Sequence, residues 1–239
     1  MIVNPWTSLD VEHDGPYVLI EDRSFVCAYN AALTLRDERA PNLSRTHIFE
    51  NLVPEPWLGR RDAPVCLLLL NPGMADEDLA LHRDSAFRAA LAHSIVDDLA
   101  PHFPLASPPE WPARRWWSAA LASVRRALDV DDASALRNAI SAIQLFPYHS
   151  REFGHLGVRV SSQAACIARV HEHLERRTLL VVRSWLSWVG AVPELADPGR
   201  ADHVIPLRGR GVRLHPNTLG DAAAFDRVVE AICPRLIDR

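Results

Sequence analysis

The chain of 239 residues contains no lysine, and all 26 of its basic residues are arginine. A P-loop lysine, a lysine that attaches pyridoxal phosphate and a catalytic lysine imine are therefore excluded. If the protein removes bases from DNA, it cannot cut the strand through a Schiff base. A Gly-x-Ser-x-Gly sequence is also missing, which lowers the case for an unrelated α/β hydrolase acting on a small metabolite.

Long hydrophobic runs and clustered cysteines are absent as well. No stretch approaches 18 uninterrupted apolar residues, so we expect no contact with a membrane. The first six residues lack the basic and apolar regions of a signal peptide, which favours a cytoplasmic protein. None of the four cysteines lies within four residues of another, so no local zinc or iron–sulfur motif is present.

Two further motifs contain residue types that bind metal ions, but neither has the arrangement of a metal site. His171 and His173 are two positions apart in a predicted helix, where their side chains point in different directions. Asp76-Glu77-Asp78 fits the first turn of a helix, where the helix dipole favours negative charge. We therefore expect no metal and no cofactor.

The net charge of −4 argues mildly against a general nucleic-acid binder. Arginine clusters at 114–115, 125–126 and 208–213 are either parts of a phosphate-facing surface or solvated faces of helices and loops. The tandem Trp116-Trp117 is more typical of a packing anchor than of a platform on which bases stack.

Apolar runs bounded by turn residues predict the strands. The expected strands are 65–70, 139–146, 179–182 and 203–207, with weaker candidates at 17–20 and 212–214. The expected helices are 26–36, 78–99, 116–128, 132–138, 161–177, a short one after 185, and 221–232. Strands that alternate with helices predict an α/β fold of three layers, with helices on both faces of a mainly parallel four-stranded sheet. Residues 1–64 have no clear period, so we expect them to form an N-terminal extension or cap on a main domain of residues 65–239.

Ligands of such sheets bind outside the carboxyl ends of the strands. The polar segments that follow the strands begin at Asn71, Pro147, Arg183 and His215. We therefore expect these four segments to converge on one site.

Two of these segments carry a family resemblance. Leu70-Asn71-Pro72-Gly73 after the first strand and Leu214-His215-Pro216-Asn217-Thr218-Leu219 near the end resemble the two signature motifs of the uracil-DNA glycosylase superfamily. The likeness covers residues 65–232 in the order of elements, and about ten residues carry it. It identifies the chain as a divergent member, which implies the three-layer fold of that superfamily and DNA as a partner.

The resemblance also implies roles for individual residues. Asn71 holds the attacking water, and His215 donates a hydrogen bond to a carbonyl oxygen of the departing base. Leu219 lies where the family inserts an apolar wedge into the duplex. Asn217-Thr218 replaces the usual Ser-Pro, and the family's base-reading asparagine is replaced by the segment 147–150, so the identity of the base is left open.

The full set of predicted site residues has two expected catalytic members, and each residue has a structural alternative. Asn71 also suits a turn that ends a strand, Tyr148 suits either base stacking or packing, and His149 suits either proton transfer or a structural hydrogen bond. Arg183 suits either a phosphate contact or a pair with a carboxylate. The predicted catalytic residues are Asn71 and His215, and the predicted substrate-binding residues are Pro72, Gly73, Met74, Tyr148, His149, Ser150, Arg183, Asn217 and Leu219.

Two functions remain open at this point. One is hydrolysis of the N-glycosidic bond of a damaged or deaminated base in DNA, with water and no cofactor. The alternative is a protein of the same fold that binds a base or nucleotide without chemistry.

Overall fold

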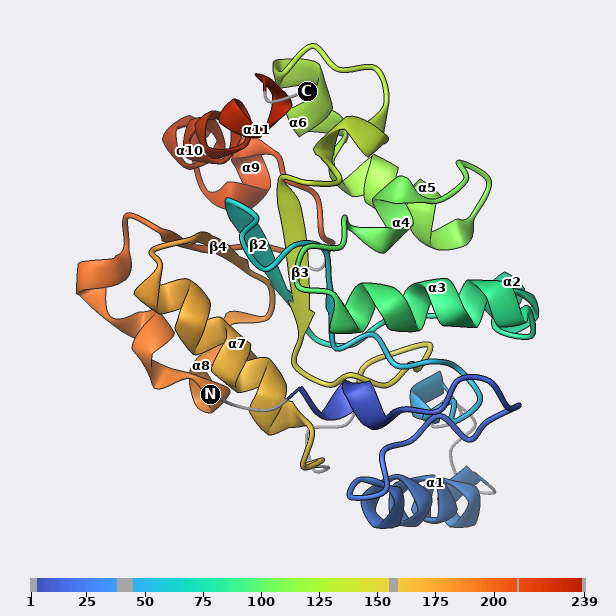
Figure 1. Ribbon diagram of the computed structural model, residues 1–239. Helices are drawn as coiled ribbons and strands as arrows, with labels where there is room; N and C mark the ends of the chain where they lie inside the picture. The colour runs from blue at the N-terminus through green and yellow to red at the C-terminus, as the bar shows by residue number, and fades with distance from the viewer. Residues whose placement is uncertain (1–3, 38–44, 155–158, 210, 238–239) are drawn as a thin grey trace. The chain divides into compact units, whose positions relative to one another are not determined.

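The structure is a computed structural model that describes residues 4–37, 45–154, 159–209 and 211–237 (Figure 1). It has an α/β fold. Five strands form one sheet in the order β1-β3-β2-β4-β5. The strands are β1 (Trp57–Leu58), β2 (Val65–Leu69), β3 (Ile140–Gln144), β4 (Leu179–Val182) and β5 (Val204–Pro206).

The sheet has five strands rather than the expected four. The additional strand, β1, has only two residues and lies in a proline-punctuated segment that gives no strand pattern. The candidate strands at 17–20 and 212–214 did not form, and both segments are irregular backbone.

The four apolar runs did become strands, because each can be buried on both faces. Every residue of β2 and β4 is buried, as a strand in the interior of a parallel sheet requires. β2 pairs in parallel with β4, with Val65 opposite Leu179 and Leu68 opposite Val182. β4 pairs in parallel with β5. The expectation of a mainly parallel sheet is therefore confirmed for this part of it.

The chain divides into two compact units, each built from discontinuous segments. Unit 1 comprises residues 1–57, 70–96 and 144–168, and unit 2 comprises residues 58–69, 97–143 and 169–239. The division differs from the expected boundary at residue 64, because residues 70–96 and 144–168 cluster with the N-terminal segment.

Unit 1 contains the helices that precede and follow β2 in the chain. A single helix was expected over residues 78–99, and the structure has two, α2 and α3. The break has a local cause, since the Asp84 carboxylate accepts a hydrogen bond from Ala86 N at 2.8 Å and starts the second helix. The helices that begin in unit 1 are η1 (Pro5–Ser8), α1 (Arg23–Asp37), α2 (Asp76–Leu81), α3 (Ser85–Val96) and α7 (Gln163–Glu175), of which α7 continues into unit 2.

Unit 2 contains most of the sheet and the remaining helices. Its last long helix, α10, begins where the sequence predicts, because the Asp221 carboxylate caps Ala224 N at 2.8 Å. α10 packs against α6, α9 and β2. The helices that begin in unit 2 are α4 (Phe103–Ala106), α5 (Pro112–Ala120), α6 (Ala122–Ala127), η3 (Ala133–Leu136), α8 (Trp185–Ala191), η4 (Pro193–Ala196), η5 (Pro198–Arg200), α9 (Pro216–Leu219), α10 (Ala222–Ile232) and α11 (Pro234–Ile237).

Within the part of the chain that the structure describes, no helix combines the length and the apolar character that crossing a bilayer requires.

Candidate functional site

The predicted site residues fall into two groups, one in each unit. The first group follows β2 and β3, and the second follows β4 and β5. Unit 1 holds Asn71, Pro72, Gly73, Met74, Tyr148, His149 and Ser150, and unit 2 holds Arg183, His215, Asn217 and Leu219. The convergence of the two groups stays a prediction.

In unit 1, Asn71 has a fixed orientation. Its side-chain nitrogen donates to Pro72 O and to Ser150 Oγ, both at 2.9 Å. Among the described residues, its side-chain oxygen has no hydrogen bond. An amide held in this way presents an oxygen that can accept a hydrogen bond from a water molecule. Gly73 lies in open space, since a Cβ added there would meet no atom within 4 Å.

His149 packs inside unit 1 rather than standing free as a proton carrier. Its Nδ1 faces Gly73 O at 3.1 Å, and its Nε2 faces Val53 O at 3.0 Å. A carbonyl oxygen only accepts hydrogen bonds, so the ring satisfies both only with a proton on each nitrogen. The carboxylate of Glu55 lies 3.7 Å from Nε2.

His82 contacts the backbone of the same residue, Val53. Its Nδ1 accepts a hydrogen bond from Val53 N at 2.9 Å, so its proton belongs on Nε2. Burial, reinforced by the charges of His149 and Arg88, lowers the pKa of His82 to about 2, which keeps this ring neutral. Burial raises the pKa of the Glu55 carboxyl, while the charge of His149 opposes that rise.

Glu55, His82 and His149 form a cluster with the composition of a metal site. One ligand atom from each lies within 4.8 Å of the others, and two histidines with one carboxylate are common ligands of zinc and iron. The hydrogen bonds do not fit a metal, because a ligand nitrogen needs a free lone pair. Both nitrogens of His149 face carbonyl oxygens, and Nε2 of His82 carries the proton of that ring.

Tyr148 is part of the core of unit 1. It is fully buried, and its hydroxyl donates to the carboxylate of Asp22 at 2.7 Å. The same carboxylate accepts hydrogen bonds from the backbone nitrogen and the hydroxyl of Ser162. Of the two alternatives for Tyr148, these contacts favour packing over base stacking.

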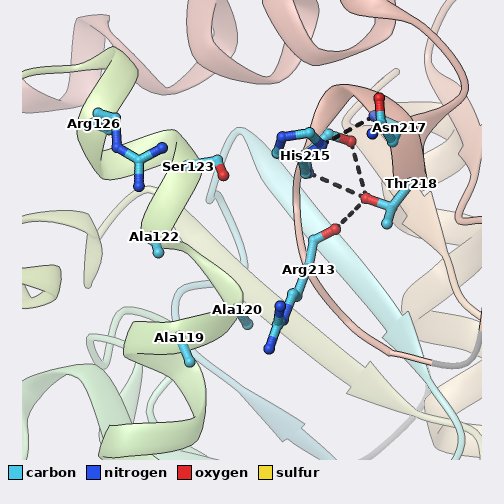
Figure 2. A pocket seen from close by; sticks show the side chains of 9 residues that line it. All are labelled: Ala119, Ala120, Ala122, Ser123, Arg126, Arg213, His215, Asn217 and Thr218. Atoms are coloured by element: carbon cyan, nitrogen blue, oxygen red, sulfur yellow. Dashed lines mark hydrogen bonds between the residues drawn. The ribbon is translucent and has the colours of Figure 1, made fainter.

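In unit 2, His215 begins helix α9 and is exposed. Its Nδ1 accepts a hydrogen bond from Asn217 N at 3.2 Å (Figure 2). A ring nitrogen that accepts carries no proton, so the neutral imidazole has its proton on Nε2. The side chain therefore offers a hydrogen-bond donor to a ligand, which is the role that the resemblance implies.

His215 lines a cavity of about 570 Å³ in unit 2, a volume within the range of small-molecule sites. Arg126 projects toward it from α6 and Arg213 from the segment before α9 (Figure 2). Neither guanidinium group makes a hydrogen bond or an ion pair with another residue that the structure describes. The cavity is lined by Ala119, Ala120, Ala122, Ser123, Arg126, Arg213, His215, Asn217 and Thr218, so it has no acidic wall.

A second cavity of about 250 Å³ adjoins the first. The two share Ser123, Arg126 and His215, and the second adds the aromatic ring of Phe225. Together they place cationic groups, one imidazole donor and an aromatic ring around a connected hollow. This combination suits a ligand that has an anionic group and a flat ring.

The remaining predicted residues of unit 2 differ in their relation to this cavity. Asn217 lines it and is exposed. Leu219 is only 4% exposed, so a wedge at this position requires α9 to move. Arg183 does not line the cavity, and burial lowers the pKa of its guanidinium group.

We compared the chain with known protein families, curated protein sequences and solved structures, and nothing matched it. The resemblance to the uracil-DNA glycosylase superfamily therefore depends on the two motifs alone.

Sequence reasoning missed the cluster of Glu55, His82 and His149, because its members come from three distant segments without a spacing motif. It named Arg126 and Arg213 only as members of arginine clusters. Arg210, in the same cluster as Arg213, lies outside the described residues.

Proposed function

We propose that the protein binds a phosphate-bearing nucleotide unit in the cavity beside His215. The observation that carries this proposal is a cavity of nucleotide-like size whose walls hold no carboxylate and two arginines that lack a partner among the described residues. A guanidinium group stays charged at every physiological pH and matches the geometry of phosphate oxygens. An acidic ligand is therefore attracted, and a cationic one is repelled.

The other polar groups of the cavity suit a base. The Nε2 proton of His215 can reach a carbonyl oxygen on a base edge, and the amide of Asn217 offers both a donor and an acceptor. The aromatic ring of Phe225 borders the adjoining cavity and can contact the face of the ring.

Calorimetric titration with deoxynucleoside monophosphates and the matching nucleosides tests this proposal. We expect the monophosphates to bind more tightly, because charge-assisted hydrogen bonds to phosphate are absent from the nucleosides. Arg126→Ala and Arg213→Ala should each weaken monophosphate binding about tenfold or more. The control Arg83→Ala removes an exposed arginine of unit 1 and should leave affinity unchanged. Equal affinity for nucleotides and nucleosides, or no binding of either, would refute the proposal.

A second candidate function is hydrolysis of an N-glycosidic bond, as a divergent member of the uracil-DNA glycosylase superfamily with its three-layer fold. The orientation of Asn71 favours it, because Ser150 and Pro72 fix the amide nitrogen and leave the oxygen to hold a water molecule. An amide is a poor base, so such an enzyme relies on stabilising the departing base anion, for which the Nε2 proton of His215 is suited. This mechanism requires the segments around Asn71 and His215 to meet on one substrate.

Base release from single- and double-stranded oligonucleotides that contain uracil or damaged bases tests the second candidate. We expect released base and an intact strand that breaks only on alkaline treatment, because no lysine is present to form an imine. Asn71→Ala and His215→Ala should each abolish release, while Arg83→Ala should not. If the wild-type protein releases no base from any substrate but binds nucleotides, binding without chemistry is the function.

A further inference from the structure

The two adjacent tryptophans of α5 have different environments. Trp117 is 3% exposed and packs edge-on against His102, with ring centroids 4.3 Å apart. Trp116 is 43% exposed, although an indole is among the most costly side chains to leave in water. The two indoles meet edge to face at 5.0 Å with an interplanar angle of 84°, so the buried ring holds the exposed one in place.

Trp116 lies on the face of α5 that borders the cavity. Residues three and four positions apart in a helix share one face, and Ala119 and Ala120, which stand in these positions relative to Trp116, both line the cavity. Side chains of a helix lean toward its N-terminus. Helix periodicity therefore puts the exposed indole on the same face of α5 as these two alanines, on the N-terminal side of them.

We infer that Trp116 and the cavity beside His215 form one surface for single-stranded nucleic acid. This inference rests on the proposed nucleotide binding. One nucleotide occupies the cavity with its phosphate at Arg126 and Arg213, and the base of a neighbouring nucleotide stacks on Trp116.

Stacking on Trp116 requires a single strand. Each base in a duplex is covered on both faces by its neighbours, whereas the bases of a single strand expose faces that an aromatic side chain can cover. The arginines beside the platform supply the backbone contacts that such surfaces need. The three alanines that line the cavity at 119, 120 and 122 have short side chains, which add little bulk to its wall.

Fluorescence anisotropy with a labelled oligothymidylate and with a duplex of the same length tests this inference. We expect the single strand to bind more tightly. Trp116→Ala should weaken its binding about tenfold, the effect of losing one base–aromatic stack, and Trp116→Phe should retain most of the affinity. The control Leu186→Ala removes another exposed apolar side chain of unit 2, 85% exposed and outside the cavity, and should have no effect.

Two further readouts separate stacking from a structural effect and from failure of the proposed function. Binding of a mononucleotide should be the same in Trp116→Ala and wild type. Oligonucleotide binding should quench the tryptophan fluorescence of the wild type more than that of Trp116→Phe. Suppose that Trp116→Ala binds the single strand with the affinity of the wild type, while Arg126→Ala and Arg213→Ala bind it more weakly. The inference about Trp116 then fails and the proposed function stands. If neither mononucleotide nor oligonucleotide binds the wild type, both fail.

Discussion

The two units of the molecule differ in net charge and in whether their polar side chains are buried or exposed. Unit 1 carries 8 arginines against 14 acidic residues, and unit 2 carries 18 against 16, so net charges of −6 and +2 make up the −4 of the chain. The polar side chains singled out in unit 1 are mostly buried and bonded to one another or to backbone. Those of unit 2, at Arg126, Arg213 and His215, are exposed and line a cavity.

This difference shows why net charge is a poor guide to the partners of this chain. In the net charge of the whole chain, the acidic residues of unit 1 outweigh the positive charge around the cavity in unit 2. The difference between the units also predicts two kinds of effect. Substitutions in unit 1 should change the stability of the protein, and substitutions at the cavity should change ligand binding.

The largest effect should come from the core of unit 2. Trp188 is fully buried, and its indole nitrogen donates to Leu69 O at 3.0 Å. Trp188→Ala removes the ring and leaves a cavity and an unpaired carbonyl, so we expect a loss of about 4 kcal/mol in the free energy of unfolding. Urea denaturation followed by circular dichroism measures it. The matched control is Trp116→Ala, which should change stability by less than about 1 kcal/mol because that ring is half exposed.

A buried carboxylate should give the next largest effect, in unit 1. Asp22 is fully buried and accepts hydrogen bonds from Tyr148 and Ser162. Asp22→Ala leaves these donors without a partner, and we expect a loss of about 3 kcal/mol in urea denaturation. The exposed Asp10, whose partner His13 is also exposed, supplies the control Asp10→Ala. Equal effects of the two substitutions would contradict the contrast between buried and exposed groups.

Acid should destabilise both units through their buried histidines. Burial lowers the pKa of His82 in unit 1 to about 2 and that of His102 in unit 2 to about 3. The unfolded chain takes up these protons below the ordinary pKa of about 6.5, whereas the folded protein does not. Stability is therefore complete above pH 6.5 and falls as the pH is lowered toward 3, by about 2.7 kcal/mol per histidine at pH 4.5.

Urea denaturation between pH 7 and pH 4.5 measures this loss. His102→Leu should make the dependence on pH shallower by about one proton, because leucine does not titrate. A variant with the slope of the wild type would show that His102 takes up its proton equally in both states.

The smallest effect on stability should come from the cavity. Arg126→Ala and Arg213→Ala remove exposed side chains without partners among the described residues, so each should change the free energy of unfolding by less than about 0.5 kcal/mol. A large loss of stability would show that the two arginines have a structural role and would remove the basis of the proposed binding site. The same urea experiment measures it.

The sequence was sufficient for elements whose signal is continuous. The runs that became β2 and β4 are apolar at every position, and no other structure buries such runs as simply as the interior of a sheet. The α10 helix was predictable from Asp221 at its start. The periodicity of apolar residues did not predict a helix break that depends on a single side chain. The Asp84 carboxylate divides one expected helix into two, and the periodicity of the apolar residues continues across that break.

The candidate site was predictable only in part. Asn71 and His215 were found because each belongs to a motif. The orientation of their side chains was not predictable. The Asn71 amide is oriented by Ser150, and the His215 ring is oriented by the backbone at the start of α9. The cavity itself arises from the packing of α5 and α6 near α9, which a linear pattern does not record. Trp116 and Trp117 are identical in sequence terms, and only the fold separates the exposed ring from the buried one.

The backbone of Val53 determines how protons are distributed inside unit 1. Its N–H donates to His82 and its carbonyl accepts from His149, so one imidazole is fixed as an acceptor and the other as a donor. These roles cannot be exchanged, because a backbone N–H only donates and a carbonyl oxygen only accepts. The amide proton of Val53 should therefore exchange slowly with deuterated solvent, and the two imidazole rings should give distinct nitrogen resonances that identify a single arrangement of their hydrogens.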